Sequence, residues 1–281
     1  MKIHAFLLSA TALLLAACQS NSSDTAEQSA GSAFNYAHWN IGHFSSGTSM
    51  NSNIEPQDAQ ARLAEYKAYL KPFELDWIGI SEYSENFAKD GSVKASKTLF
   101  APYQNQFIGA ANEYQWNAQF GNGRFKTLER KLVDYNPRRQ KCYFIAQKVE
   151  IDGKYDAWII QTHLDWHNPE IYRDPQFRQL IDFAKDKPRV IISADFNNHP
   201  FGGFDEFHWF GYFQKEGFVL AFPDKSLLNE TFRNRKNPQK HLFIDNIIVK
   251  GFDVSNAGIL ADEVAKFSDH YLMHCTLTPK K

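Results

Sequence analysis

Short apolar segments rich in β-branched and aromatic residues recur along this chain, and each carries a polar residue at or near its end. Such segments are typical of buried strands. They are FNYAHWN with Asn40, DWIGISE with Glu82, AWIIQTH with His163, RVIISADFN with Asp195 and Asn197, LFIDNIIV with Asp245, and FSDHYLMHCTL with Asp269 and His270. A carboxylate buried alone at a strand end would be costly, so it needs a partner or becomes neutral. The pattern therefore predicts that these side chains converge on one pocket at the rim of a sheet or sandwich.

Two segments between these strands have the spacing of amphipathic helices. Residues 58–73 place Ala59, Leu63, Tyr66 and Leu70 near one face, and residues 174–186 do the same with Phe177, Leu180, Ile181 and Ala184. Strands and helices therefore alternate loosely. Residues 83–140 are polar, aromatic and irregular in pattern, with FGNGRF and YNPRRQ as turn signals.

Composition sets few further limits. The 281 residues are 43% hydrophobic and 22% charged, which is enough to bury a sizeable core in one domain. The formal net charge is −1, so bulk electrostatics gives no argument for a polyanionic partner. Cys142 and Cys275 could form a disulfide in an oxidising compartment if their strands are neighbours, and the sequence leaves this open.

The first residues, MKIHAFLLSATALLLAAC, have the charge and apolar pattern of a signal peptide. The segment ends in Leu15-Ala16-Ala17-Cys18, which resembles the bacterial lipobox. This resemblance implies a signal peptide over 1–17, lipidation of Cys18, a flexible tether over 18–33 and a folded domain over 34–281, anchored in the cell envelope at the outer membrane or a periplasm-facing membrane. The alternative is an ordinary secretory signal that contains an incidental cysteine.

Six motifs, WNIGHF, GISEYSEN, QTHLDWHN, SADFNNHP, FIDNIIV and FSDH, resemble in their order and separation the motifs of the endonuclease/exonuclease/phosphatase superfamily, the DNase I-like metal-dependent phosphohydrolases. The resemblance covers residues 34 to 278. It implies an α/β (α+β) fold, a four-layer α-β-β-α sandwich with the active site across the strand ends, in a chain that we expect to be a monomer.

The resemblance also implies roles for the polar residues. Glu82, aided by Asn40 and Asp269, would hold Mg²⁺ or Mn²⁺ through oxygen ligands. Asp195 would orient or deprotonate the attacking water and Asn197 would position water and phosphate. His163 and His270 would donate to the phosphate oxygens, and Asp245 would keep His270 oriented and protonated. Asn122, in FGNGRF, is a weaker candidate for a phosphate contact.

The substrate stays open at this point. The segment TFRNRKNPQKH gathers Arg233, Arg235 and Lys240, which could contact a polyanion such as a DNA backbone or could form an ordinary solvated loop. We therefore expect an exported nuclease or general phosphodiesterase. The alternatives are a phosphatase or sphingomyelinase-like phospholipid hydrolase of the same fold, and a catalytically silent surface binding module.

Overall fold

The computed structural model describes residues 32–45, 51–109, 116–136, 142–198, 209–223, 230–233, 241–260 and 264–281. The predicted signal peptide over 1–17, the lipidation site Cys18, the tether up to residue 31, and the basic residues Arg235 and Lys240 all lie outside these ranges. The description below concerns the compact unit Gly31–Lys281.

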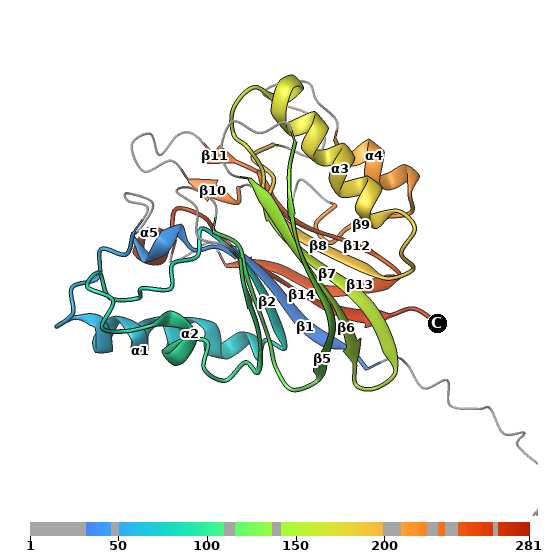
Figure 1. Cartoon of the computed structure of the whole chain (residues 1–281). Helices are drawn as coiled ribbons and strands as arrows, with labels where there is room; N and C mark the ends of the chain where they lie inside the picture. Colours follow the sequence, from blue (N-terminus) through green and yellow to red (C-terminus); the bar gives the residue numbers. More distant parts are fainter. Residues whose placement is uncertain are drawn as a thin grey trace, which may run out of the picture. The chain divides into compact units, whose positions relative to one another are not determined.

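The described residues form two six-stranded sheets and a small two-stranded ribbon (Figure 1). The first sheet has the order β13 (Phe252–Leu260), β14 (Leu272–Pro279), β1 (Phe34–Asn40), β2 (Trp77–Ser81), β4 (Ala118–Gly121) and β3 (Asn105–Ile108). The second has the order β5 (Phe125–Asp134), β6 (Tyr143–Ile151), β7 (Tyr155–His163), β8 (Val190–Asp195), β12 (Asp245–Lys250) and β9 (Val219–Leu220). The ribbon pairs β10 (Phe232–Arg233) with β11 (His241–Leu242).

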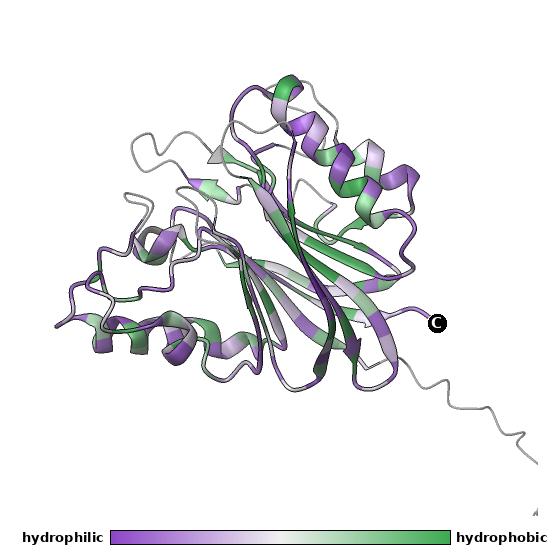
Figure 2. Cartoon of the chain, viewed as in Figure 1, coloured by the Kyte–Doolittle hydropathy of each residue, from purple (hydrophilic) through white to green (hydrophobic). Residues whose placement is uncertain are grey.

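The two sheets pack face to face through a shared core. Trp77 of the first sheet clusters with Ile159 and Ile191 of the second, and all three are fully buried. The contact is close around Gly79, where a Cβ atom would overlap the side chain of Gln161. Glycine at this position therefore lets the two sheets approach each other, and Figure 2 shows hydrophobic residues along the strands between the helices.

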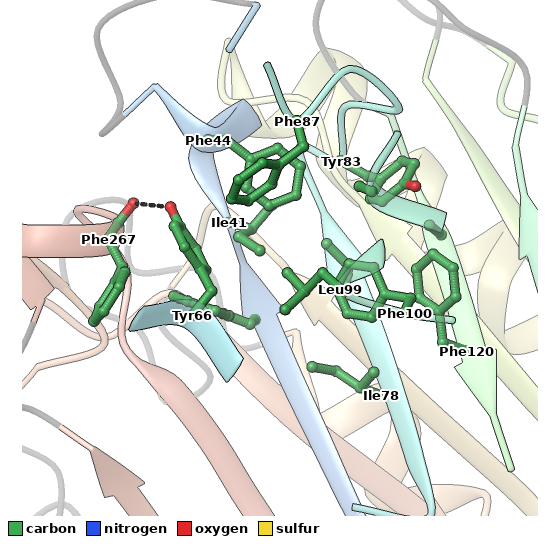
Figure 3. Packing of buried hydrophobic residues seen from close by; sticks show 14 of the residues in the cluster. Ile41, Phe44, Tyr66, Ile78, Tyr83, Phe87, Leu99, Phe100, Phe120 and Phe267 are labelled. Atoms are coloured by element: carbon green, nitrogen blue, oxygen red, sulfur yellow. Dashed lines mark hydrogen bonds between the residues drawn. The ribbon is translucent and has the colours of Figure 1, made fainter. Parts of the chain in front are cut away.

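Helices cover the outer face of each sheet. Helices α1 (Ala59–Leu70), α2 (Ala95–Thr98) and α5 (Val264–Phe267) lie beside the first sheet, and α3 (Asp174–Ala184) and α4 (Phe210–Lys215) cover the second (Figure 1). Figure 3 shows the hydrophobic core between the first sheet and its helices. In this core the Tyr66 hydroxyl donates a hydrogen bond to the Phe267 carbonyl oxygen at 3.3 Å. The layers are thus helix, sheet, sheet, helix, which confirms the predicted sandwich.

The predicted helical faces are nearly correct. All four apolar residues predicted for α3 are buried, and so are three of those predicted for α1. Leu70 is only half-buried, because the buried stripe of α1 ends at Tyr69, whose ring lies 5.3 Å from that of Trp39. Each fully buried side chain of this size contributes about 1.5–3 kcal/mol of transfer free energy, so these faces fix both helices on their sheets.

The irregular pattern of residues 83–140 gave a wrong impression of that region. It contains α2 and the strands β3, β4 and β5. Strand β5 lies at the edge of its sheet. Of its apolar side chains, Phe125 is buried and Val133 half-buried, while Leu128 and Leu132 are exposed. An edge strand with one solvated face lacks the apolar run that marks a central strand.

Two further points concern cysteines and membranes. Cys142 precedes β6 in the second sheet and Cys275 lies in β14 of the first, so no disulfide joins these two described residues. None of the helices in the described ranges is long and apolar enough to cross a membrane.

Candidate active site

Strand pairing brings the predicted residues of the second sheet into one row. Strands β7 and β8 are parallel, which sets His163 opposite Asp195 at their carboxyl ends. Strand β12 runs antiparallel to β8, which sets its first residue, Asp245, opposite Asp195 on the other side. The apparent position of Asp245 inside an apolar segment is thus a strand start, and it reaches the same edge as the two strand ends.

The first sheet supplies the facing row. Strands β1 and β2 are parallel and pair Asn40 with Ser81, so Glu82 follows at the same edge. Strand β14 is antiparallel to β1, and His270 therefore precedes its first residue beside the end of β1. The Ser268 hydroxyl fastens this segment by donating to the Asn40 carbonyl oxygen at 2.7 Å and accepting from the His270 backbone N–H at 3.1 Å.

Asn40 joins the two rows. Its Nδ2 donates to Glu82 Oε1 at 3.1 Å and to Asp195 Oδ2 at 3.0 Å, and it lies 3.4 Å from His270 Nε2. Its Oδ1 accepts from the Gly42 backbone N–H at 3.1 Å. The amide is fully buried, so the site is one hydrogen-bonded network across both sheets.

His270 and Asp245 form the shortest charged contact of this network. His270 Nδ1 lies 2.8 Å from Asp245 Oδ2, and both residues are almost fully buried. Burial by itself lowers the pKa of His270, but the carboxylates of Asp245 and Asp195 outweigh it and raise that pKa to about 10. Burial opposes ionisation of Asp245, yet the His270 charge and hydrogen bond hold its pKa below the usual value. His270 is therefore cationic at neutral pH.

Asp195 and His163 are shifted in opposite directions. Burial, together with the nearby Asp245 charge, raises the pKa of Asp195 to about 6. Burial lowers the pKa of His163 to about 4, despite the attraction of Glu82. His163 is thus neutral at pH 7, with Nε2 at 3.3 Å from Asp195 Oδ2. Buried groups with strongly shifted pKa values are typical of functional sites.

Three residues at this site have a positive φ angle, in the left-handed region that residues other than glycine rarely adopt. Glu82 has φ of 51°, Asn197 of 49° and His43 of 53°. The His43 backbone N–H donates to the Glu82 carbonyl oxygen at 2.7 Å, and the Asn197 N–H donates to Asp195 Oδ1 at 2.9 Å. Such conformations cost free energy and persist where surrounding contacts hold them, often at functional sites.

Among the residues predicted to bind a cation, Glu82 fits that purpose in charge and donor type. Burial and the neighbouring Asp269 charge both raise the pKa of Glu82, a repulsion that a bound cation would relieve. Glu82, His163 and Asp195 each offer one ligand atom within 4.8 Å of the others. In the present arrangement Asn40 faces the carboxylates with Nδ2, so its oxygen would become a ligand only after the amide turns over.

The structure also brings in residues that the sequence did not single out. His38 Nε2 lies 3.3 Å from the second oxygen of Asp245, and His43 Nε2 lies 3.8 Å from Glu82 Oε2. Both imidazoles are buried, and burial lowers the pKa of His43 to about 4. Asn117 precedes β4 at the same sheet edge, and its buried Oδ1 has no hydrogen-bond partner among the described residues. The one sequence signal for these three residues is that each is a polar residue inside an apolar segment.

The prediction for Asn122 is wrong. Its Nδ2 donates to Asp76 Oδ1 at 2.7 Å, and Asp76 precedes β2, whereas Glu82 follows it. Six residues of extended chain separate the two ends by about 20 Å. Asn122 instead holds the turn after β4, where its Oδ1 accepts from the Arg124 backbone N–H at 3.0 Å.

The remaining predicted residues lie at the rim. Asp269 is half-buried, and its carbonyl oxygen accepts from the Arg233 backbone N–H at 2.9 Å. The Arg233 guanidinium is 46% exposed and pairs with Glu230 Oε1 at 2.8 Å. Arg233 is therefore adjacent to the site through β10, while the rest of the predicted basic segment lies outside the described residues.

No protein-family model and no curated protein sequence matches this chain. Solved structures do match it. An endonuclease/exonuclease/phosphatase family protein from Bacteroides thetaiotaomicron aligns with a TM-score of 0.66 at 15% identity, over 89% of this chain and 99% of that one. The endonuclease/exonuclease/phosphatase from Bacteroides vulgatus gives 0.66 at 17% identity, over 89% and 100%. TDP2 from D. rerio, solved with a single-strand DNA product, gives 0.66 at 15% identity, over 88% and 99%. The chain thus has the fold of these proteins.

Proposed function

We propose that this chain is a metal-dependent phosphodiester hydrolase with nuclease-like activity, exported to the cell envelope. The observation that carries the proposal is the convergence of Asn40, Glu82, Asp195 and His270 from both sheets, in which the Asn40 amide bridges the two carboxylates and lies 3.4 Å from His270 Nε2. The fold shared with endonuclease/exonuclease/phosphatase proteins supports it.

The site has the groups that attack of water on a phosphodiester requires. Asp195 is ionised above pH 6 and has a pKa close to the working pH, as suits a group that accepts a proton from water. The backbone N–H of Asn197 holds one of its oxygens, at 2.9 Å, and so fixes the direction of the other.

Stabilisation of the developing negative charge falls to His270. Its cationic imidazole is held by Asp245 on Nδ1, which leaves Nε2 facing the space beside Asn40 and Asp195. A fixed cationic donor aimed at a phosphoryl oxygen lowers the barrier because the transition state carries more charge there than the substrate does. A divalent cation held by Glu82 with Asn40 and Asp269 would supply further stabilisation of that charge.

The substrate class that we propose is nucleic acid. The TDP2 structure that shares this fold contains a single-strand DNA product. In the present chain Arg233 presents an exposed guanidinium beside Asp269. Phosphate contacts of this kind position a nucleic acid without reading its sequence.

The lipobox-like segment supports the proposed location. Lipidation at Cys18 would tether the hydrolase to the envelope through the segment from residue 18 to 33, and stable anchoring takes more than one acyl chain. The activity would then act on substrates outside the cytoplasm.

A substrate panel tests the proposal. The full chain should hydrolyse phosphodiesters with Mg²⁺ or Mn²⁺ and lose the activity in EDTA. Asp195→Asn and His270→Ala should each lower kcat by a factor of about 100 or more. The matched controls are Asp253→Asn, which changes a carboxylate that is 72% exposed, and His274→Ala, four residues further along the same strand segment. Full activity in EDTA would refute the proposal.

A further inference from the structure

Trp166 is the most exposed large apolar side chain of the described residues, with 60% of its surface accessible. It lies in the segment that directly follows β7, three residues after His163. An exposed tryptophan costs hydrophobic free energy unless something covers it, and aromatic side chains exposed near a site often bind a ligand.

The Trp166 ring is held in place from one side. It stacks on the imidazole of His167, with the ring centroids 3.9 Å apart and the planes at 30°. His167 is in turn fixed by Asp165, whose Oδ1 lies 2.6 Å from Nδ1 and accepts from the His167 backbone N–H at 2.8 Å. Asp165 is fully buried. One face of the indole is therefore occupied by a braced imidazole.

Helix α3 and the turn before it fix the backbone under this pair. The Arg173 guanidinium donates to the Trp166 carbonyl oxygen at 2.9 Å, and the Asp165 backbone N–H donates to Gln176 Oε1 at 3.0 Å. Arg173 and Gln176 are both buried. A ring fixed in this way loses little conformational entropy when a second ring stacks on it.

The ring also lies within reach of the reacting centre. Three residues of extended chain span at most about 11 Å, so the Trp166 backbone cannot lie further than that from the His163 backbone. The intervening Leu164 carbonyl oxygen accepts from Asn197 Nδ2 at 2.8 Å, which ties the segment to the site. A base on a nucleotide next to the bound phosphate could therefore meet the indole.

We propose that Trp166, braced by His167 and Asp165, is a stacking platform that binds a base of a single-stranded nucleic acid beside the scissile phosphate. The inference rests on the proposed phosphodiesterase function and specifies its substrate. Stacking on an aromatic side chain tolerates any base, because every base has a π-face. The platform would thus favour base-bearing single strands over other phosphodiesters.

A lipid surface is the competing occupant of an exposed tryptophan. Residues 164–173 contain the acids Asp165 and Glu170 against one arginine, so the segment lacks the cationic cluster that attracts anionic lipid. Insertion of the indole would also bring the stacked His167 and its carboxylate partner toward the apolar phase, which is unfavourable. These features favour the base.

The test compares the full-length wild type with Trp166→Ala, Trp166→Phe and the control Ile171→Ala, whose side chain is 54% exposed in the same segment. For each protein, KM and kcat are measured on a short single-stranded oligonucleotide and on the same oligonucleotide with an abasic residue beside the scissile phosphate. Trp166→Ala should raise KM for the intact strand by about five- to a hundredfold with little change in kcat, and Trp166→Phe should restore most of the loss. The abasic strand should show the raised KM already with wild type, and Trp166→Ala should add little to it.

Several outcomes would overturn the inference while leaving the phosphodiesterase proposal intact. Equal KM values for wild type and Trp166→Ala on the intact strand would do so, as would an enzyme that hydrolyses other phosphodiesters and leaves single strands uncut. A Trp166→Ala variant that loses binding to phosphatidylcholine vesicles but keeps its KM would show that the ring serves lipid. Absence of metal-dependent hydrolysis of any phosphoester would instead refute the proposed function itself.

Discussion

Asp245→Asn tests the claim that His270 acts as a cation. The substitution keeps the size of the side chain and an oxygen that can accept from His270 Nδ1, at present 2.8 Å away, but it removes the negative charge. What remains around the imidazole is burial, which lowers its pKa, and the carboxylates of Asp269 and of Asp195, whose Oδ2 lies 3.7 Å from Nε2. The pKa of His270 should therefore fall.

The ordinary pKa of a histidine sets the scale of the fall. Asp245 is the largest of the influences that raise the pKa of His270 from 6.5 to about 10, so its loss should lower that pKa well below 10. At pH 8, a pKa at the ordinary histidine value of about 6.5 would leave about 3% of the molecules protonated, and a rate that needs the cation would drop about thirtyfold.

Stability should change with pH in the matching direction. Because the folded state raises the pKa of His270, the imidazole stabilises the fold fully below pH 6.5, and this contribution is lost as pH rises toward about 10. The wild-type free energy of unfolding should therefore fall across that range. Asp245→Asn should show a smaller fall there, because it has less of this stabilisation to lose.

The assay is a pH–rate profile of kcat/KM together with an NMR titration of His270 in the metal-free protein. The alkaline limb should move to lower pH in Asp245→Asn and stay in place in Asp253→Asn. The double variant Asp245→Asn/His270→Ala should be little worse than the more damaging single variant, since residues that act as one unit are non-additive. An unmoved limb with fully additive losses in log rate would refute the pairing.

Three further predictions concern the metal, the core and the anchor. Glu82→Gln should weaken Mn²⁺ binding in calorimetry and lower kcat by about 100-fold or more without changing the melting temperature appreciably, and unaltered affinity would remove Glu82 from the metal site. Leu180→Ala, at a fully buried position of α3, should cost about 2–5 kcal/mol in urea unfolding, against less than about 0.5 kcal/mol for Leu132→Ala, which is 41% exposed in wild type. Cys18→Ser should move the protein out of the membrane fraction of its host or leave it unprocessed, and a wild type found wholly in the soluble fraction would contradict lipidation.

A site residue could be predicted from the sequence where its position at the end of a single strand is enough to place it. Asn40, His163 and Asp195 each end an apolar strand, and the edge at which such strands end is shared within a parallel pair. The polar residue at the end of each apolar segment therefore located them. Glu82 followed from the same logic, one residue beyond β2.

The additional contacts of the site, beyond the predicted pair of Asp245 and His270, could not be predicted because they depend on pairing between distant segments. His38 looks like an interior residue of its strand, and its contact with Asp245 joins positions 207 residues apart. Asn122 failed for the same reason, since a turn motif does not say at which end of the sheet it lies. The edge strand β5 was not predicted because its exposed face carries charged residues, a composition that is also typical of loops.

The most direct measurement is the initial rate at which the full chain cleaves a single-stranded oligonucleotide with Mg²⁺, in EDTA, and after Asp195→Asn. The account predicts cleavage that depends on Mg²⁺, disappears in EDTA and falls by about 100-fold or more in the variant, while Asp253→Asn stays at the wild-type rate. Cleavage that persists undiminished in EDTA or in Asp195→Asn would contradict the account.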